Sequence, residues 1–168
     1  MSETVYSNPF FRVVKNGPMH HVEESGGDNN AVVLVRLEDA FAFIKTHRPA
    51  NDGMFIEAPR GGAELDETGV ACAIRELCEE TGISLHPDEL IQIGVVYPNT
   101  GMMRSKADVF VAPVSRPLIS MDGAGTEQML VVADSQIEHM VASGAIVDGF
   151  TLSALALYMC RESGCSNV

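Results

Sequence analysis

The sequence predicts an α/β fold, an α/β/α sandwich in which a mixed β-sheet is covered by helices on both sides. Two observations predict it. Strand-length apolar runs stand before and after one amphipathic helix between Thr68 and Gly82, and two further helices end the chain. The length of 168 residues suits one domain over 1–168, with an N-terminal extension of short strands over 1–30.

Five strands are expected before the helix. The run over 31–37 is almost continuously apolar, which is typical of a strand buried on both faces. The segment 40–46 is its expected hairpin partner. Short strands are also expected over 10–14, 19–24 and 54–57.

The helix that follows has a start signal and a stop signal. Thr68 is a residue type that favours the N-cap, and Gly82 suits the left-handed conformation that ends many helices. One helix face is apolar, because aliphatic residues recur at three- and four-residue steps. These residues are Val70, Ala73, Ile74 and Leu77.

Three strands and a long loop are expected after this helix. The strands span 90–97, 107–113 and 129–132. The segment 115–126 is rich in Ser, Pro, Gly and Asp, and a loop of that length more often carries function than architecture.

Two helices complete the predicted order. The first is expected to begin at a Ser135 cap and to stop at Gly144, and the second to span 151–161. The second helix is rich in apolar residues at helical spacing. Those expected to face the body of the domain are Leu152, Leu155, Ala156 and Met159.

Three carboxylates share one side of the helix between Thr68 and Gly82. Glu76, Glu79 and Glu80 stand at positions i, i+3 and i+4. Such like charges repel one another by about 0.2–0.5 kcal/mol per exposed pair, and a hard cation would turn the repulsion into coordination. The spacing alone leaves two interpretations open, a metal site or an acidic helix face in water.

The surrounding residues resemble the signature of the Nudix hydrolases, Gly-x5-Glu-x7-Arg-Glu-U-x-Glu-Glu-x-Gly-U, where U is a bulky aliphatic residue. Every specified position is filled. The matching residues are Gly61, Glu67, Arg75, Glu76, Leu77, Glu79, Glu80, Gly82 and Ile83. The resemblance covers the chain from about residue 31 onward, and implies the same sandwich fold and a divalent metal on this helix.

The metal ligands are implied by the same resemblance. Glu76 and Glu80 would be the strongest ligands, with Glu79 sharing the ion or holding its water. The backbone carbonyl of Arg60 would be a further ligand, and Glu67 stands near enough to assist. The expected ion is Mg²⁺, with Mn²⁺ as the alternative.

The resemblance also implies which residues take part in catalysis. Arg75 would pair with Glu67 and orient the metal-binding carboxylates. A Glu on the loop after the last long strand would act as the base, and Glu127 stands at the similar position. An ordinary exposed glutamate is the alternative for Glu127. The implied catalytic set is Glu127, Glu79 and Arg75.

The signature stretch over 61–83 is called the box below. Features outside it resemble the ADP-ribose pyrophosphatase branch of the family. They are Arg48-Pro49, the run Glu57-x-Pro59-x-Gly61, Pro98, and Gly144-x-Ile146-x-Asp148. The expected substrate-binding residues are Arg48, Arg60 and Glu57, and by this likeness Arg48 would contact the diphosphate. A solvated arginine in a loop is the alternative for Arg48. Arg60 stands where many family members carry a small residue, so it is expected to add a phosphate contact or to alter specificity.

Together these resemblances imply Mg²⁺-dependent hydrolysis of a nucleoside diphosphate linked to another moiety. The most favoured reaction is ADP-ribose to AMP and ribose 5-phosphate. The alternatives are another nucleotide sugar, a dinucleoside polyphosphate or NADH as substrate, or a non-catalytic Nudix module that senses a nucleotide. A third class, an acidic interaction protein, would leave the complete box unexplained.

Charge and composition limit the classes of partner and the cellular location that are expected. The formal net charge of −12 argues against binding nucleic acid or an anionic membrane, because both attract positive patches. The four cysteines show no Cys-x-x-Cys pair and the start shows no signal-peptide pattern, so a cytoplasmic location is expected. A homodimer is expected from the resemblance.

Overall fold

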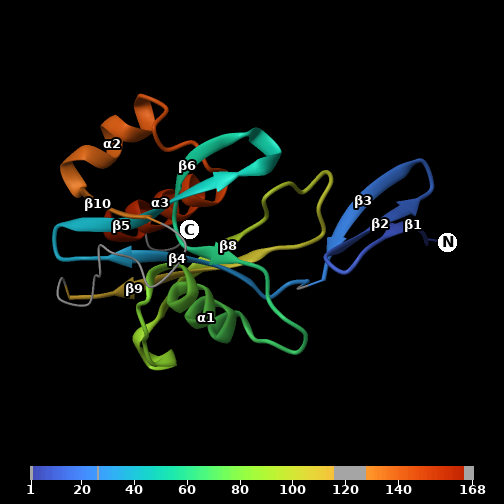
Figure 1. Ribbon diagram of the computed structural model, residues 1–168, viewed down its shortest axis with the longest axis horizontal. Helices are drawn as coiled ribbons and strands as arrows, with labels where there is room; N and C mark the ends of the chain where they lie inside the picture. Colours follow the sequence, from blue (N-terminus) through green and yellow to red (C-terminus); the bar gives the residue numbers. More distant parts are fainter. Residues whose placement is uncertain (1, 26, 116–127, 165–168) are drawn as a thin grey trace.

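The structure is a computed structural model that describes residues 2–25, 27–115 and 128–164. A mixed sheet forms its middle layer, with α1 (Gly69–Thr81) on one face and α2 (Asp134–Ala142) and α3 (Gly149–Glu162) on the other (Figure 1). The predicted α/β/α sandwich is therefore confirmed.

The central sheet consists of seven strands among the described residues, in the order β10-β5-β4-β9-β8, with β6 beside β5 and β7 beside β4. Strands β4 and β9 pair in parallel, and the other pairs are antiparallel. The strands are β4 (Asn30–Arg36), β5 (Ala40–Arg48), β6 (Gly53–Glu57), β7 (Arg60–Gly61), β8 (Ile91–Val96), β9 (Ala107–Pro113) and β10 (Gln128–Ala133).

Strand β4 lies at the centre of the sandwich, as its continuous apolar run predicts. Val33 and Val35 belong to the core cluster that includes Leu77 of α1. Val32 and Leu34 belong to the opposite cluster, which includes Leu155 of α3. Because successive residues of a strand point to opposite faces, burial on both faces requires an apolar residue at nearly every position.

Helix α1 has both predicted caps. The Thr68 hydroxyl accepts a hydrogen bond from the Ala71 amide at 3.2 Å. Gly82 adopts φ 73°, a left-handed conformation, and its amide donates to the Cys78 carbonyl. These caps fix the helix bounds, and therefore the direction in which its glutamates project.

The N-terminal strands form a separate three-stranded antiparallel sheet that projects from one end of the molecule (Figure 1). It consists of β1 (Ser2–Ser7), β2 (Phe11–Asn16) and β3 (Met19–Glu24). Strand β1 was not expected from the sequence. All six of its residues are exposed, so β1 carries no buried apolar stripe that would reveal a strand.

Two predictions about the C-terminal helices are wrong. Helix α2 begins after Ala133, without a side-chain cap, so Ser135 lies inside its first turn. On α3, Ala156 and Met159 are exposed, while Ala154 and Leu155 are buried. The buried stripe includes Ala154 and Leu155 and lies about 100° around α3 from the predicted stripe, since each residue turns the helix by about that angle.

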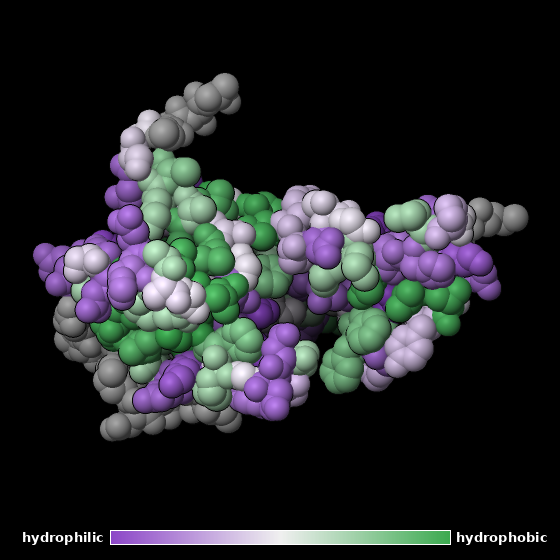
Figure 2. Space-filling view, turned by 90° about the horizontal axis from the view of Figure 1, so that it is seen from above, coloured by the Kyte–Doolittle hydropathy of each residue, from purple (hydrophilic) through white to green (hydrophobic). Residues whose placement is uncertain are grey.

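The exposed stripe of α3 borders an apolar surface groove that it shares with α2. The groove measures about 430 Å³, and its lining includes Val141, Leu152 and Met159. Figure 2 shows hydrophobic surface on this side of the molecule. Within the described residues, every helix is too short or too polar to cross a lipid bilayer.

Candidate active site

The short strand β7 brings the start of the box against helix α1. Gly61 pairs with Ala31 of β4, and Arg60 pairs with Val32. A Cβ atom added to Gly61 would occupy the space that the Glu76 carboxylate holds. A glycine is therefore required at this position if the Glu76 carboxylate is to lie against the backbone.

Arg75 forms ion pairs with three carboxylates, two on α1 and one just before it. Its Nε and Nη2 atoms donate to the two carboxylate oxygens of Glu67 at 3.0 and 2.9 Å. Its Nη1 atom donates to Glu76 at 2.7 Å and to Glu79 at 3.1 Å. These bonds, the one to Glu67 first, raise the pKa of the Arg75 guanidinium above its usual range. The structure thus contains the Glu67–Arg75 ion pair that the family resemblance implies.

Two carboxylates in this cluster have shifted pKa values of opposite sign. The Glu76 side chain is 14% exposed, and burial raises its pKa, although the Arg75 bond opposes that shift. The hydrogen bond from Arg75 lowers the pKa of Glu67. The Arg75 bond therefore outweighs desolvation at Glu67, whereas desolvation outweighs the Arg75 bond at Glu76.

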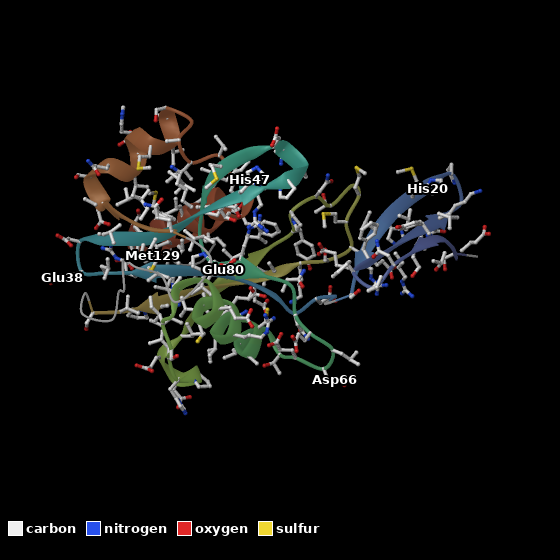
Figure 3. All side chains as sticks on the ribbon, viewed as in Figure 1. His20, Glu38, His47, Asp66, Glu80 and Met129 are labelled. Carbon is white, nitrogen blue, oxygen red and sulfur yellow. The ribbon has the colours of Figure 1, made fainter. Side chains whose placement is uncertain are left out.

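Glu80 contacts the backbone of Arg60, just before the box. Its Oε2 atom accepts a hydrogen bond from the backbone amide of Arg60 at 3.0 Å. In Figure 3, Glu80 lies between α1 and the strands of the sheet. The contact places Glu80 beside the residue whose carbonyl is a predicted ligand.

The donor set fits a hard divalent cation. Glu67, which precedes α1, and Glu76 and Glu79 on α1 share the single guanidinium of Arg75, and Glu80 of α1 adds a fourth carboxylate. Carboxylate and carbonyl oxygens are the ligands that Mg²⁺ and Mn²⁺ prefer. In the present side-chain arrangement, no three His, Cys, Asp or Glu residues of the described part converge on one point. In this arrangement Arg75 contacts one carboxylate oxygen of Glu76 and one of Glu79.

A second ion-pair cluster adjoins the first. Glu57 is only 1% exposed, and Arg48 donates to it through Nη2 at 2.5 Å and Nε at 3.0 Å. The Nη2 atom of Arg60 lies 3.0 Å from Glu57 and 3.3 Å from Asp148. The Arg60 guanidinium also lies 4.7 Å from the centre of the Phe150 ring. The three predicted substrate-binding residues, Arg48, Arg60 and Glu57, are thus brought together.

Two hydrogen-bonding details show how this second cluster is built. Its hydrogen bond to Glu57 raises the pKa of the Arg48 guanidinium. The Nε atom of Arg60 is buried and has no hydrogen-bond partner in the described residues. An unpaired buried donor costs about 1–3 kcal/mol, which a ligand oxygen would recover.

Helix α3 contributes residues that the sequence analysis did not assign to the site. Asp148 caps α3 by accepting from the Thr151 amide at 2.9 Å, and also binds Arg60. The Thr151 hydroxyl accepts from the Ala58 amide at 2.9 Å. Asp148-x-x-Thr151 is visible in the sequence as a helix start, but nothing local shows that it meets the box. Glu127, the predicted base, lies outside the described residues.

Comparisons with known proteins agree with this geometry. The fold is similar to the crystal structure of an ADP compounds hydrolase, with a TM-score of 0.69 and 19% sequence identity, over 100% of this chain and 95% of that one. Curated proteins gave no match. A model of the NUDIX domain matches residues 27–117, more than half of the sequence and the whole of the box. The chain therefore belongs to the Nudix family.

Proposed function

We propose that this chain is a metal-dependent hydrolase that cleaves the diphosphate bond of a nucleoside diphosphate linked to another moiety, with ADP-ribose as the preferred substrate. The observation that carries the proposal is the complete set of box carboxylates gathered around Arg75 and Gly61. The similar fold of an ADP compounds hydrolase supports the choice of an ADP-linked substrate. A nucleotide-sensing module would not need this full set of carboxylates.

Glu76, Glu80 and the Arg60 carbonyl would hold Mg²⁺ or Mn²⁺, with Glu79 as a shared ligand. A bound ion neutralises diphosphate oxygens and lowers the pKa of a bound water. Arg75 and Glu67 act as positioning residues, because their bidentate pair holds the helix carboxylates on one side. Glu127 remains the proposed base.

Arg48 and Arg60 would bind the diphosphate of the substrate. Both guanidinium groups are held by the buried Glu57, which orients them at little entropic cost when a ligand binds. The Nε donor of Arg60 makes no hydrogen bond within the part of the chain that the structure describes. A phosphate oxygen is the acceptor that fits such a donor.

The reaction is tested by incubating the purified chain with Mg²⁺ and ADP-ribose. AMP and ribose 5-phosphate are the expected products, identified by mass, and a chelator should abolish their release. The same assay with NADH, a dinucleoside polyphosphate and other nucleotide sugars ranks the alternative substrates. Binding without turnover on any of them would favour the nucleotide-sensing module instead.

Arg60→Ala is expected to raise KM for the substrate by about tenfold, the effect of losing one charge-assisted hydrogen bond. The expected change in kcat is smaller, because the backbone of residue 60 keeps its bond to Glu80. Steady-state kinetics measure both, and circular dichroism checks the fold. Arg161→Ala on the exposed end of α3 is the matched control. An unchanged KM would remove Arg60 from the substrate site.

We also propose that the chain forms a homodimer. The projecting N-terminal sheet exposes large apolar residues, among them Val5 at 49% and Tyr6 at 53%, and an exposed apolar patch commonly marks an interface. Sedimentation equilibrium measures the mass in solution, and a monomer at micromolar concentration would contradict this proposal.

A further inference from the structure

A polar cleft lies where the N-terminal sheet meets the loop between β8 and β9. Strand β3 is tied to this loop by two backbone hydrogen bonds, from the Val22 amide to the Met102 carbonyl at 2.7 Å and from the Arg104 amide to the Val22 carbonyl at 3.0 Å. Next to this junction lies a cavity of about 210 Å³. Figure 2 shows the notch between the N-terminal sheet and the body. The two backbone bonds fix the walls of the cleft relative to each other.

The cleft and a smaller cavity at the proposed active site share Glu24 as a lining residue. Glu24 lines this cavity and also a smaller one, of about 90 Å³, that Arg60 and Gly61 border. Its carboxylate accepts from the Asn30 side chain at 3.0 Å, and Asn30 in turn accepts from the Ala63 amide of the box at 3.2 Å. If the diphosphate lies at the box, the cleft on the far side of Glu24 is the neighbouring space into which the rest of a ligand would extend.

The mouth of the cleft carries two arginines fixed by one carboxylate. Arg12 donates to Glu23 at 2.8 Å and Arg104 donates to it at 3.2 Å. Hydrogen bonds from His21, first, and from Arg12 lower the pKa of Glu23 to about 2. Glu23 therefore stays ionised at neutral pH and holds both guanidinium groups in place.

Ser105 is the polar residue of the cleft that lacks a partner. It is 2% exposed, and its hydroxyl makes no hydrogen bond to any described residue. A buried hydroxyl without a partner costs free energy, and native structures pair nearly all such groups. Ser105 lines the cavity, and its side chain can rotate about χ1 between staggered positions. A ligand in the cavity can therefore supply the missing partner.

The lining selects among chemical classes of ligand. Glu23, Glu24 and Asp28 oppose a phosphate, because their three carboxylates outnumber the two arginines. A nucleobase would need an aromatic or apolar face on which to stack, and the described residues around this cavity include no aromatic side chain. Hydroxyl groups both donate and accept, and they match a wall that mixes guanidinium, carboxylate and hydroxyl groups.

We propose that this cleft binds a sugar, the polyhydroxylated group attached to the second phosphate of the substrate, with Ser105 and Arg104 contacting its hydroxyls. The proposal rests on the proposed function for the direction in which the substrate extends from the box. It assigns the choice of the linked group to the N-terminal sheet and to the β8–β9 loop, rather than to helix α1.

The test uses two ligands that differ only in the sugar and that hydrolysis cannot destroy. α,β-Methylene-ADP-ribose carries the sugar, and the methyl ester of α,β-methylene-ADP lacks it. Each is titrated calorimetrically, in the presence of Mg²⁺, into the parent chain and the Ser105→Ala, Arg104→Ala and Ser143→Ala variants. Ser143 lies at the end of α2, away from the cleft, and serves as the control.

The parent should bind the sugar-bearing ligand more tightly than the methyl ester. Ser105→Ala should weaken only the sugar-bearing ligand, by about fivefold to tenfold, as expected for one hydrogen bond. Arg104→Ala should act in the same direction, and Ser143→Ala should change neither affinity. Loss of an unpartnered hydroxyl should not lower the melting temperature, so a folding defect would be recognised.

Three results would overturn the proposal: equal affinities of the parent for the two ligands, an unchanged affinity in both cleft variants, or an equal loss for both ligands. The last would place the nucleoside end, not the sugar, in the cleft. If the parent fails to hydrolyse ADP-ribose yet shows the sugar-dependent binding, the cleft assignment stands while the proposed hydrolase function falls.

Discussion

Glu80→Gln is expected to lower kcat by at least about 100-fold with little change in stability. The substitution removes one negative ligand from the proposed metal site, where charge stabilisation amounts to several kcal/mol, and about 1.4 kcal/mol corresponds to a tenfold change in rate. The glutamine carbonyl can still accept the hydrogen bond that the Arg60 amide donates to Glu80. The packing of α1 against the sheet is therefore preserved.

Three measurements separate a loss of metal binding from a loss of fold. Steady-state kinetics give kcat, a Mn²⁺ titration of the protein alone gives the affinity for the ion, and thermal unfolding gives the melting temperature. Glu64→Gln, at an exposed position in the same box, is the matched control and should behave like the parent. Parental turnover and parental Mn²⁺ affinity in Glu80→Gln would exclude Glu80 as a ligand.

Gly61→Ala is expected to lower activity to a similar extent through a steric cause. The added methyl group would overlap the Glu76 carboxylate, and backbone atoms held by β4 cannot move away without breaking the β7 pairing. The flexible Glu76 side chain is the part that must shift. We expect it to leave its position beside Arg75, which disrupts the carboxylate cluster.

The neighbouring glycine provides a sharp control for this steric effect. A Cβ atom on Gly62 would contact only Asn30, at 3.7 Å, an ordinary van der Waals distance. Gly62→Ala should therefore retain turnover within about threefold of the parent, whereas Gly61→Ala should lose at least about 100-fold. Comparable activity in the two variants would show that the close approach of Glu76 to Gly61 is not needed for catalysis.

Arg60 joins the two halves of the proposed site. Its backbone amide donates to Glu80, and its side chain binds Glu57 and Asp148. A change at this residue therefore reaches both the carboxylates of α1 and the cluster that is proposed to bind substrate. This double role explains why KM and kcat must be measured separately in the Arg60 variant.

The local features of this chain could be predicted from its sequence. Thr68 and Gly82 cap α1 as expected, because capping depends on the residue itself and on neighbours within one turn. The burial of β4 on both faces follows from its continuous apolar run. The Glu67–Arg75 contact was implied by the family resemblance, and the structure shows it between the segment before α1 and α1 itself.

Other features could not be predicted in this way. Ala156 and Met159 were expected to face the body, yet both are exposed, because two apolar stripes of α3 differ by about 100° and only packing selects between them. Strand β1 was missed because it buries none of its residues. The proposed base, Glu127, lies outside the described residues and stays a prediction.

The sequence by itself determined the family, the helix that carries the carboxylates and the spacing of those carboxylates. Only the tertiary structure decided that Gly61 lies against Glu76, that Asp148 meets Arg60, and that Ser105 lines a cleft beside β3. The physical reason is separation along the chain. Caps and helix faces arise from residues within a few positions of one another, whereas these contacts join distant segments that strand pairing and helix packing bring together.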